Sequence, residues 1–542
     1  MARRFFPRVC AFVLACGMLS TPGALAAPIT RDTNLQYFNY NGRTLALVGT
    51  SASYLCHVTQ PDREDSYCTW ENRTSFLNDL RDKGLNKIRL WLALNHSPGS
   101  RPIDSPGTAT HNELTPYTYE QPFKWDPVNK YWNLDLWEQG FFDRVAQVVS
   151  DAQARGIIVE ATLFAPFDGA FENSPWHDRN NSPQGVNKSL SAEKYFTAYD
   201  NAGGTGDDSL GNQYVRTRQR AFIQKMVGTL NAFDNFYWEV SNEPDNANED
   251  MTGTINWHRD MIQEIVNAEA PLPKKHMIAV NFSQDQTVNW AAAQANIQII
   301  NGHYVAISDF AGTGRVRNGA IEMIRKFLRP TQTGNVDKTF GFNEGRISPN
   351  VTGADENSVR AEAWEFMLNE GGSFDHLGYE WKLNPAAANI RTQLGVLAKF
   401  LNGEYVNGVL VTPGLTLRNV SRQIMNPVSW CPDIAAYGSG NTYWGAMQWT
   451  RNEHALYIHH STLGTETFKK YNPVVTGGGY SHNFRLSLGS LAGNFTARWI
   501  DPKTGLDVAA PHNFYWPANG TLYQLPTSPS YNFDILLYVK RQ

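Results

Sequence analysis

The chain has 542 residues and a formal net charge of −4, and 42% of its residues are hydrophobic and 12% aromatic. A chain of this length can bury a large core and is long enough for two or more domains. Charged residues of one sign form no long run, so the composition gives no support for a protein that binds nucleic acid or an anionic membrane surface.

The first 26 residues have the pattern of a secretion signal. Three arginines precede an apolar run from Val9 to Leu19, and an Ala-Leu-Ala triplet fits the small-x-small rule for cleavage after Ala26. The alternative is a lipoprotein anchored at Cys16, because the residues before that cysteine resemble a lipobox. We therefore expect a secreted or periplasmic protein. No other apolar stretch is long enough to span a bilayer.

The cysteines fit an oxidising compartment without defining a metal site. Of the five, Cys10 and Cys16 belong to the signal, which leaves Cys56, Cys68 and Cys431. A disulfide between Cys56 and Cys68 would close one long loop and leave Cys431 unpaired. Their spacing does not match a zinc site.

Beyond the signal, strand-like and helix-like segments alternate. The predicted strands cover Thr44–Val48, Lys87–Leu94, Ile157–Phe164, Phe236–Glu243, His276–Phe282, Ile297–His303, Thr339–Asn343 and Phe374–Trp381. The predicted helices cover Thr74–Lys83, Leu134–Arg155, Tyr214–Phe233, Asn256–Ala268, Ala320–Phe327, Val359–Asn369 and Ile390–Leu401. Eight strands that alternate with helices over roughly 360 residues predict an α/β fold, a (β/α)8 TIM barrel carrying insertions. Two long insertions, 96–132 and 165–212, follow the second and third strands and should wall a cleft at the carboxyl ends of the strands.

The character of the sequence changes after roughly Gly403. Short strand-like runs separated by Gly, Asn and Pro follow, among them Tyr443–Gln448, Ala455–His459 and Phe533–Val539. Such runs predict a small all-β domain, a sandwich. We expect a signal peptide at 1–26, the barrel at 27–403, a linker at 404–425 and the C-terminal β-sandwich domain at 426–542.

Two glutamates end strands on facing sides of the predicted barrel. Glu243 ends the fourth strand, because Pro244 cannot donate to a strand ladder, and Glu344 ends the seventh. Both carboxylates can therefore reach one bond at the barrel mouth. Cleavage of a glycosidic bond needs two such carboxylates, one to donate a proton and one to attack or to activate water. Mutual proximity raises the pKa of one member, so a proton donor and an ionised nucleophile coexist near neutral pH.

The stretches WEVSNEP, NGHY and FGFNEG resemble clan A of the glycoside hydrolases, the group of retaining barrel enzymes that includes the family 5 cellulases. The resemblance implies that Glu243 is the acid/base, that Glu344 is the nucleophile and that Asn242 binds the sugar 2-hydroxyl. It also implies supporting or substrate-binding roles for Arg89 in KIRLWL, His303, Tyr304 and Trp381 in GYEW. Family 5 has a histidine at the end of strand three, where this chain has Phe164, so the resemblance does not extend to that family.

A closer resemblance is to the apiosidase-like hydrolases, a branch of the same clan. The segments NGRTLALVGTSAS and GGSFDHLGYEW of the barrel carry it, together with AAYGSGNTYWGAM and FTARWIDPKTG of the tail. The tail is similar to the small β domain known as a collagen-binding type, a label that names a fold here and implies no collagen ligand.

Each accessory residue also has a purely structural interpretation. Arg89 could form a buried ion pair with Glu160, and His303 and Trp381 could be core residues. Glu160 and Glu239 lie inside strands and read as interior polar groups of the barrel. Two further glutamates are rival nucleophiles that lack the seventh-strand context, namely Glu370 and Glu380.

No metal and no other cofactor is expected. The Asp- and Asn-rich loops at 200–212 and 245–250 could hold calcium, but most such loops are solvated turns. No His-x-His pair ends a barrel strand, which disfavours a metal-dependent hydrolase.

Taken together, the patterns predict a secreted retaining glycoside hydrolase, an O-glycosyl hydrolase that cleaves a poly- or oligosaccharide by a two-carboxylate double displacement. The alternative is a non-catalytic carbohydrate-binding or adhesion protein built on a barrel scaffold. The expected partner is a carbohydrate, with no nucleic acid and no membrane span. The sugar, the linkage, pyranoside or furanoside preference, endo or exo action and the oligomeric state are left open.

Overall fold

The computed structural model describes residues 27–32, 37–52, 55–57, 70, 72–94, 121–129, 131–165, 174–176, 181, 210–244, 251–282, 285–303, 308–309, 316–317, 338–345, 355–368, 371–376, 385–406, 409–412, 444–449, 453–459, 461–462, 472–473, 479–481, 485–486, 488, 492–518 and 523–542.

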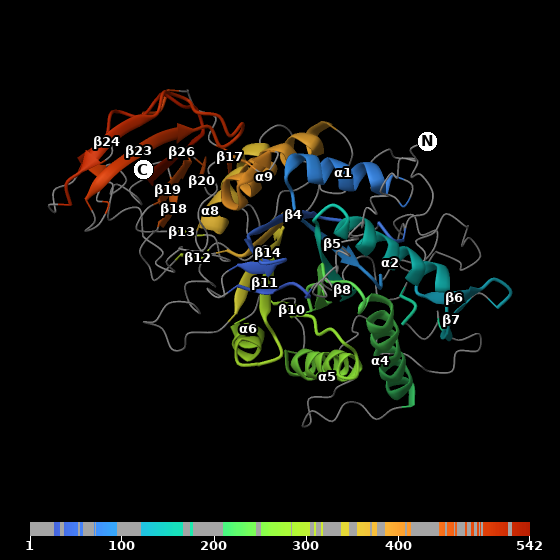
Figure 1. Cartoon of the computed structure of the whole chain (residues 1–542). Coiled ribbons are helices and arrows are strands. Elements are labelled where there is room, and N and C mark those ends of the chain that lie inside the picture. The colour runs from blue at the N-terminus through green and yellow to red at the C-terminus, as the bar shows by residue number, and fades with distance from the viewer. Residues whose placement is uncertain are drawn as a thin grey trace, which may run out of the picture.

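A closed barrel of parallel strands forms the centre of the molecule (Figure 1). In chain order its strands are β4 (Leu47–Ser51), β5 (Lys87–Trp91), β8 (Ile158–Phe164), β9 (Phe236–Ser241), β10 (Ile278–Asn281), β11 (Ile299–His303), β14 (Thr339–Gly345) and β15 (Ser373–His376). Pairing of β15 with β4, which sets Phe374 opposite Val48, closes the ring. The predicted eight-stranded TIM barrel is confirmed.

Helices surround the barrel. They are α1 (Arg73–Lys83), α2 (Gln139–Gln153), α4 (Leu210–Leu230), α5 (Met251–Glu269), α6 (Asp285–Ala292), α8 (Asp355–Leu368) and α9 (Pro385–Asn402). Helix α1 ends as predicted at Gly84, whose φ of 87° lies in the left-handed region that glycine adopts without strain. The helix predicted at Ala320–Phe327 lies outside the described residues, and α6 was not predicted.

The expected first strand, Thr44–Val48, was wrong in its bounds. The chain forms a three-stranded sheet of β1 (Thr30–Arg31), β2 (Phe38–Tyr40) and β3 (Arg43–Leu45), with the Asn-Gly turn between β2 and β3. The barrel strand β4 then begins at Leu47. Between the two strands the backbone N–H of Ala46 donates to Asn402 Oδ1 at 2.9 Å, a contact with α9 that local sequence does not encode.

The expected helix Leu134–Arg155 was wrong at its start. Residues 131–137 form strand β7 (Tyr131–Trp137), which pairs with β6 (Phe123–Asp126), and α2 begins only at Gln139. In β7 the buried Trp132 and Leu134 alternate with more exposed neighbours, which is the period of a strand.

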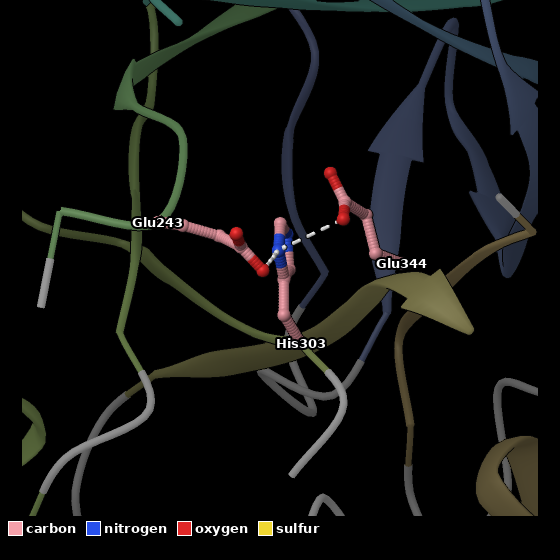
Figure 2. A group of neighbouring side chains, drawn as sticks. All are labelled: Glu243, His303 and Glu344. Carbon is pink, nitrogen blue, oxygen red and sulfur yellow. Dashed lines mark hydrogen bonds and ion pairs between the residues drawn. The ribbon is translucent and has the colours of Figure 1, made fainter. Parts of the chain in front are cut away.

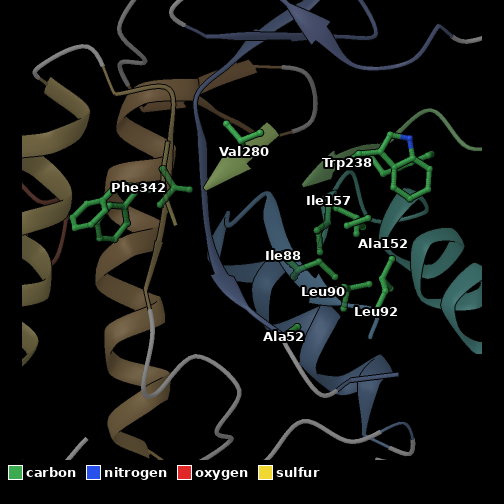
Figure 3. Close-up of a cluster of buried hydrophobic side chains, with 14 of the residues drawn as sticks. Ala52, Ile88, Leu90, Leu92, Ala152, Ile157, Trp238, Val280 and Phe342 are labelled. Carbon is green, nitrogen blue, oxygen red and sulfur yellow. The ribbon is translucent and has the colours of Figure 1, made fainter. Parts of the chain in front are cut away.

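The barrel strands carry apolar side chains outward and charged side chains inward. In β5, Ile88 and Leu90 join the apolar layer between strands and helices (Figure 3), whereas Lys87 and Arg89 enter polar contacts with other barrel strands. Both cations are completely buried. Burial of an unpaired charge is costly, so each cation requires a carboxylate partner inside the barrel.

The C-terminal region forms a five-stranded antiparallel sheet in the order β18 (Trp444–Trp449), β19 (Glu453–His459), β26 (Asp534–Arg541), β23 (Gly493–Ile500) and β24 (His512–Trp516). Strand alternation gives it two apolar faces. Tyr457 and Tyr538 belong to the main core, and Trp364 of α8 stacks on Tyr457 with ring centroids 5.6 Å apart. Ile535 and Leu537 point to the opposite face, into a separate apolar cluster.

Short strand pairs complete the described structure. They are β12 (Ser308–Asp309) with β13 (Val316–Arg317), β16 (Glu404–Val406) with β17 (Val409–Thr412), β20 (Ser461–Thr462) with β21 (Asn472–Pro473) and β22 (Arg485–Leu486) with β25 (Tyr523–Gln524). The expected linker thus begins with the hairpin β16–β17, and its remaining residues lie outside the described part, as do the signal peptide and Cys431. The expected domain limits stay a prediction.

The state of Cys56 and the lengths of the helices bear on two of the sequence predictions. Cys56 is a buried free thiol whose pKa burial raises to about 12, while Cys68 lies outside the described residues. Within the described ranges, no helix combines the length and apolarity that crossing a bilayer requires.

Candidate active site

The barrel brings together five of the seven predicted site residues at the carboxyl ends of its strands, namely Arg89, Asn242, Glu243, His303 and Glu344. Tyr304 and Trp381 lie outside the described residues. The five come from β5, the end of β9, β11 and β14, four strands distributed around the ring. Distant parts of the sequence therefore meet at one point.

Glu243 is held in an unusual backbone conformation. Its backbone φ angle is 42°, in the left-handed region that residues other than glycine and asparagine rarely adopt. The backbone N–H of Glu243 donates to Asn281 Oδ1 at 2.8 Å, so the end of β10 fixes this turn. Only 9% of the Glu243 side chain is exposed. Local strain that the surroundings sustain is typical of functional sites.

His303 lies between the two predicted catalytic carboxylates (Figure 2). A register shift between Gly302 and His303 pairs His303 with Glu344. His303 Nδ1 is 3.2 Å from Glu243 Oε1 and 3.3 Å from Glu344 Oε2. Burial lowers the pKa of His303 to about 3, against the attraction of Glu344, so the imidazole is neutral at physiological pH. Its Nδ1 can then donate one hydrogen to either carboxylate.

Arg89 binds both Glu344, the candidate nucleophile, and the side-chain amide of Asn242. Arg89 Nη1 donates to Glu344 Oε1 at 2.7 Å, and Nη2 donates to Asn242 Oδ1 at 2.8 Å. Burial opposes the charge of Arg89, but Glu239 and Glu344 together raise its pKa above the usual value. Because the amide oxygen of Asn242 faces Arg89, its Nδ2 faces away, and this buried donor has no partner among the described residues. It is available to a ligand.

A second ionic layer lies beneath the first, around Lys87. Lys87 Nζ lies 2.5 Å from Glu160 Oε2 and 2.7 Å from Asp375 Oδ2, and it donates to Ser373 Oγ at 2.8 Å. Burial raises the pKa of Asp375 to about 6 against the pull of Lys87. The alternative interpretation of Arg89, an ion pair with Glu160, is not the arrangement that forms, because Arg89 pairs with Glu239 and Glu344. Glu160 instead neutralises Lys87, because Glu239 and Glu344 already occupy the Arg89 guanidinium.

Glu243, His303 and Glu344 also form a group of possible metal ligands. One carboxylate oxygen of each glutamate and a nitrogen of His303 all lie within 4.8 Å of one another. Imidazole nitrogen and carboxylate oxygen are ligands that transition metals accept. The permanent charge of Arg89, 2.7 Å from Glu344, opposes a second cation at this place. The expectation that no metal takes part stays a prediction.

Comparison with known proteins supports the architecture. No protein-family model matches the chain, and no curated protein matches its sequence. A solved structure described as a glycoside hydrolase has a TM-score of 0.52 at 10% identity, covering 95% of this chain and 97% of its own. A Bacteroides vulgatus protein provisionally described in the same words has a TM-score of 0.52 at 12% identity, covering 95% of this chain and 83% of its own. At such identity the likeness shows the fold, which here extends over barrel and tail.

A family 5 mannosidase from Rhizomucor miehei is also similar, with a TM-score of 0.43 at 13% identity, covering 69% of this chain and 98% of its own. The lower TM-score adds nothing to the assignment of the fold.

Sequence reasoning missed two residues that shape the site. Asn281 fixes the backbone of Glu243, and Glu239, predicted only as an interior polar group, binds Arg89. Asn281 carries a usable signal, because it is the polar last residue of a buried apolar strand. A charged residue inside an otherwise apolar strand, as Glu239 is in FYWEVS, is a second such signal.

Proposed function

We propose that the protein is a secreted glycoside hydrolase of clan A that cleaves glycosidic bonds in a poly- or oligosaccharide with retention of configuration. The observation that carries this proposal is the placement of Glu243 and Glu344, whose nearest oxygens lie within 4.8 Å of each other and of a His303 nitrogen. Retaining enzymes hold their carboxyl groups about 5–5.5 Å apart, and inverting enzymes about 6.5–9.5 Å apart. Nearest oxygens this close are compatible with the retaining spacing, and together with the resemblance to clan A they support direct attack by a carboxylate.

In the first step Glu344 acts as the nucleophile. Its Oε1 accepts a hydrogen bond from Arg89 Nη1 at 2.7 Å, which holds the attacking group in place. A Glu344 oxygen forms a bond to the anomeric carbon while the bond from that carbon to the leaving oxygen breaks. Glu243 gives its proton to the leaving oxygen, so the aglycone departs as a neutral alcohol.

In the second step the ester between Glu344 and the sugar is hydrolysed. Glu243, now ionised, takes a proton from a water molecule as the water oxygen bonds to the anomeric carbon. The ester bond breaks and Glu344 leaves as a carboxylate. Two inversions at one carbon give net retention, and both glutamates return to their starting protonation states.

The neighbouring polar groups suit a sugar ligand. The Nδ2 of Asn242, for which the described residues offer no partner, is placed to donate to a sugar hydroxyl beside the reacting carbon. His303, which is neutral, donates from Nδ1 to whichever carboxylate is ionised. Tyr304 and Trp381, for which the resemblance implies substrate contacts, complete the proposed site, with the Trp381 ring stacked on a sugar face.

Secretion is proposed from the N-terminal pattern alone, with cleavage after Ala26. The apiosidase-like placement and the collagen-binding type of the tail likewise rest on the sequence stretches that resemble those groups. No sugar specificity is assigned by these resemblances.

A panel of aryl glycosides and polysaccharides tests the proposal against a non-catalytic binding protein. The wild-type mature chain should release sugar from at least one member, and Glu344→Gln should lower that rate by several orders of magnitude. Glu356→Gln serves as the control and should keep the wild-type rate, because this partly buried carboxylate of α8 binds Gln393 and no residue of the site. Binding of a glycan without release of sugar by the wild type would establish the alternative.

A further inference from the structure

A third glutamate, Glu239, lies completely buried beneath the two carboxylates, and the proposed reaction makes no direct use of it. We propose that Glu239 is a positioning residue, which holds the Arg89 guanidinium in the one orientation that binds both Glu344 and Asn242. This inference rests on the proposed function, since positioning matters only for a reaction that uses Glu344. Without this role, Glu239 would only be one of the buried polar residues that fill the interior of the barrel.

Glu239 is a dedicated acceptor. Its two oxygens accept five hydrogen bonds, from Arg89 Nε at 2.8 Å, Arg89 Nη2 at 2.5 Å, Thr162 Oγ1 at 2.6 Å, Asn301 Nδ2 at 3.0 Å and Asn343 Nδ2 at 2.7 Å. All five donors point at Glu239, an arrangement that fits a carboxylate and opposes the burial that raises the pKa of Glu239 to about 7. A carboxylate with this many donors cannot rotate without leaving buried groups unpaired.

The backbone is shaped to admit one of these donors. Gly341 in β14 lies against the side chain of Asn301, and a Cβ at that position would approach Asn301 Oδ1 to 2.0 Å. Glycine therefore gives Asn301 the space to reach across the barrel to Glu239. The neighbouring strand is adapted to the Glu239 contact.

The planar guanidinium of Arg89 transmits this constraint. Its Nε and Nη2 groups bind one oxygen of Glu239, and this contact sets the plane of the group. With the plane set, Nη1 points to Glu344 Oε1 and the second hydrogen of Nη2 points to Asn242 Oδ1. The same contact thus fixes the nucleophile and, through the orientation of the amide, the free donor on Asn242.

Glu239 also interacts with Arg89 through its charge. The charged and polar groups that the structure places against Glu239 are Arg89 of β5, Glu160 and Thr162 of β8, Tyr237 of β9, Asn301 of β11 and Asn343 of β14. Glu239 and Glu344 share the single positive charge of Arg89.

Glu239→Gln tests the proposal, with Asp375→Asn as the matched control. Both variants remove one buried carboxylate charge from the barrel interior, but Asp375 binds Lys87 and not Arg89. We expect Glu239→Gln to lower kcat by about 10²-fold, the usual cost of a misplaced reacting group. The acid limb of the pH–rate profile should move to higher pH, because a reacting carboxylate that loses its contact with Arg89 is harder to ionise. Asp375→Asn should leave the limb in place at a similar loss of thermal stability, and an equal shift in both variants would overturn the proposal.

A crystal structure of Glu239→Gln gives a readout that needs no substrate. We expect Arg89 Nη1 to lose its 2.7 Å contact with Glu344, or the Asn242 amide to turn. If Arg89 keeps both contacts, Glu239 does not position it. If Glu239→Gln fails to fold, Glu239→Asp keeps the charge and should retain the wild-type limb with a lower kcat. Failure of the wild type to cleave any glycoside would refute the proposed function, while the crystal structure would still decide the role of Glu239.

Discussion

Replacing Asp534 by alanine should weaken the attachment of the C-terminal sheet to the barrel more than any surface change does. Asp534 begins β26 and binds Arg360 of α8 through both oxygens, Oδ2 to Nε at 2.6 Å and Oδ1 to Nη2 at 2.9 Å. Its Oδ2 also accepts a hydrogen bond from the Tyr457 hydroxyl at 2.8 Å. The side chains of the ion pair are only 3% and 4% exposed.

The expected magnitude follows from burial. Water does not screen a pair this enclosed, and Asp534→Ala would leave the Arg360 charge desolvated without a partner. Loss of one member of a buried pair costs about 3–5 kcal/mol, against a total unfolding free energy of about 5–15 kcal/mol for an ordinary protein. Replacing both members with apolar residues, as in Arg360→Met with Asp534→Leu, should recover most of the loss, since no charge then remains buried.

Urea unfolding followed by circular dichroism measures the effect. The matched control is Asp507→Ala, whose pair with Arg498 within the tail is 29% and 26% exposed and should cost at most about 1 kcal/mol. At temperatures where Asp534→Ala stays folded, its activity should equal that of the wild type, because the tail supplies no group to the described site. A loss no larger than that of Asp507→Ala would refute the reasoning, and loss of activity in the folded variant would give the tail a share in catalysis.

Three further predictions follow from single contacts. Glu243→Ala should abolish cleavage of natural glycans but spare much of the first step for an activated aryl glycoside, whose leaving group needs no proton; equal losses in steady-state and burst assays would exclude the acid role. Gly341→Ala should lower the unfolding free energy by about 1–3 kcal/mol, measured by denaturant titration, because its Cβ displaces Asn301. An unchanged midpoint would mean that Asn301 moves freely. Burial lowers the pKa of His258 to about 3 and of His454 to about 4, below the usual 6.5, so stability is fully present above pH 6.5 and should fall progressively as the pH drops toward 3. Melting temperatures that stay constant between pH 7 and 5 would contradict this.

The positions of the two catalytic glutamates could be predicted because their signals are local. An apolar run that ends in Asn-Glu-Pro marks the end of a buried strand, and a second strand end in Asn-Glu repeats it. Alternation of strands and helices then places both ends at one face of a barrel. Sequence order alone sets Glu243 and Glu344 on facing strands.

The pairing of charges inside the barrel could not be predicted in the same way. Lys87, Arg89, Glu160 and Glu239 all point inward, and the sequence offers several equivalent pairings. The choice depends on which side chains of different strands meet inside the closed ring. These are properties of the closed ring and not of any one segment.

The first residue of helix α2 could not be predicted from the local sequence either. The segment YWNLDLW has apolar residues that fit either a helix face or one face of a strand. Its pairing with β6 decides for the strand, and that partner lies within an insertion whose structure no local rule specifies.

The anomer released in the first minutes of cleavage tests the central claim most directly. Proton NMR of a fresh reaction, recorded before mutarotation, identifies the configuration of the first product. If Glu344 attacks the anomeric carbon and Glu243 serves as acid and then base, the product should keep the configuration of the substrate. A first product of opposite configuration would show that water attacks directly, and would contradict the role of Glu344 and the proposed placement in clan A.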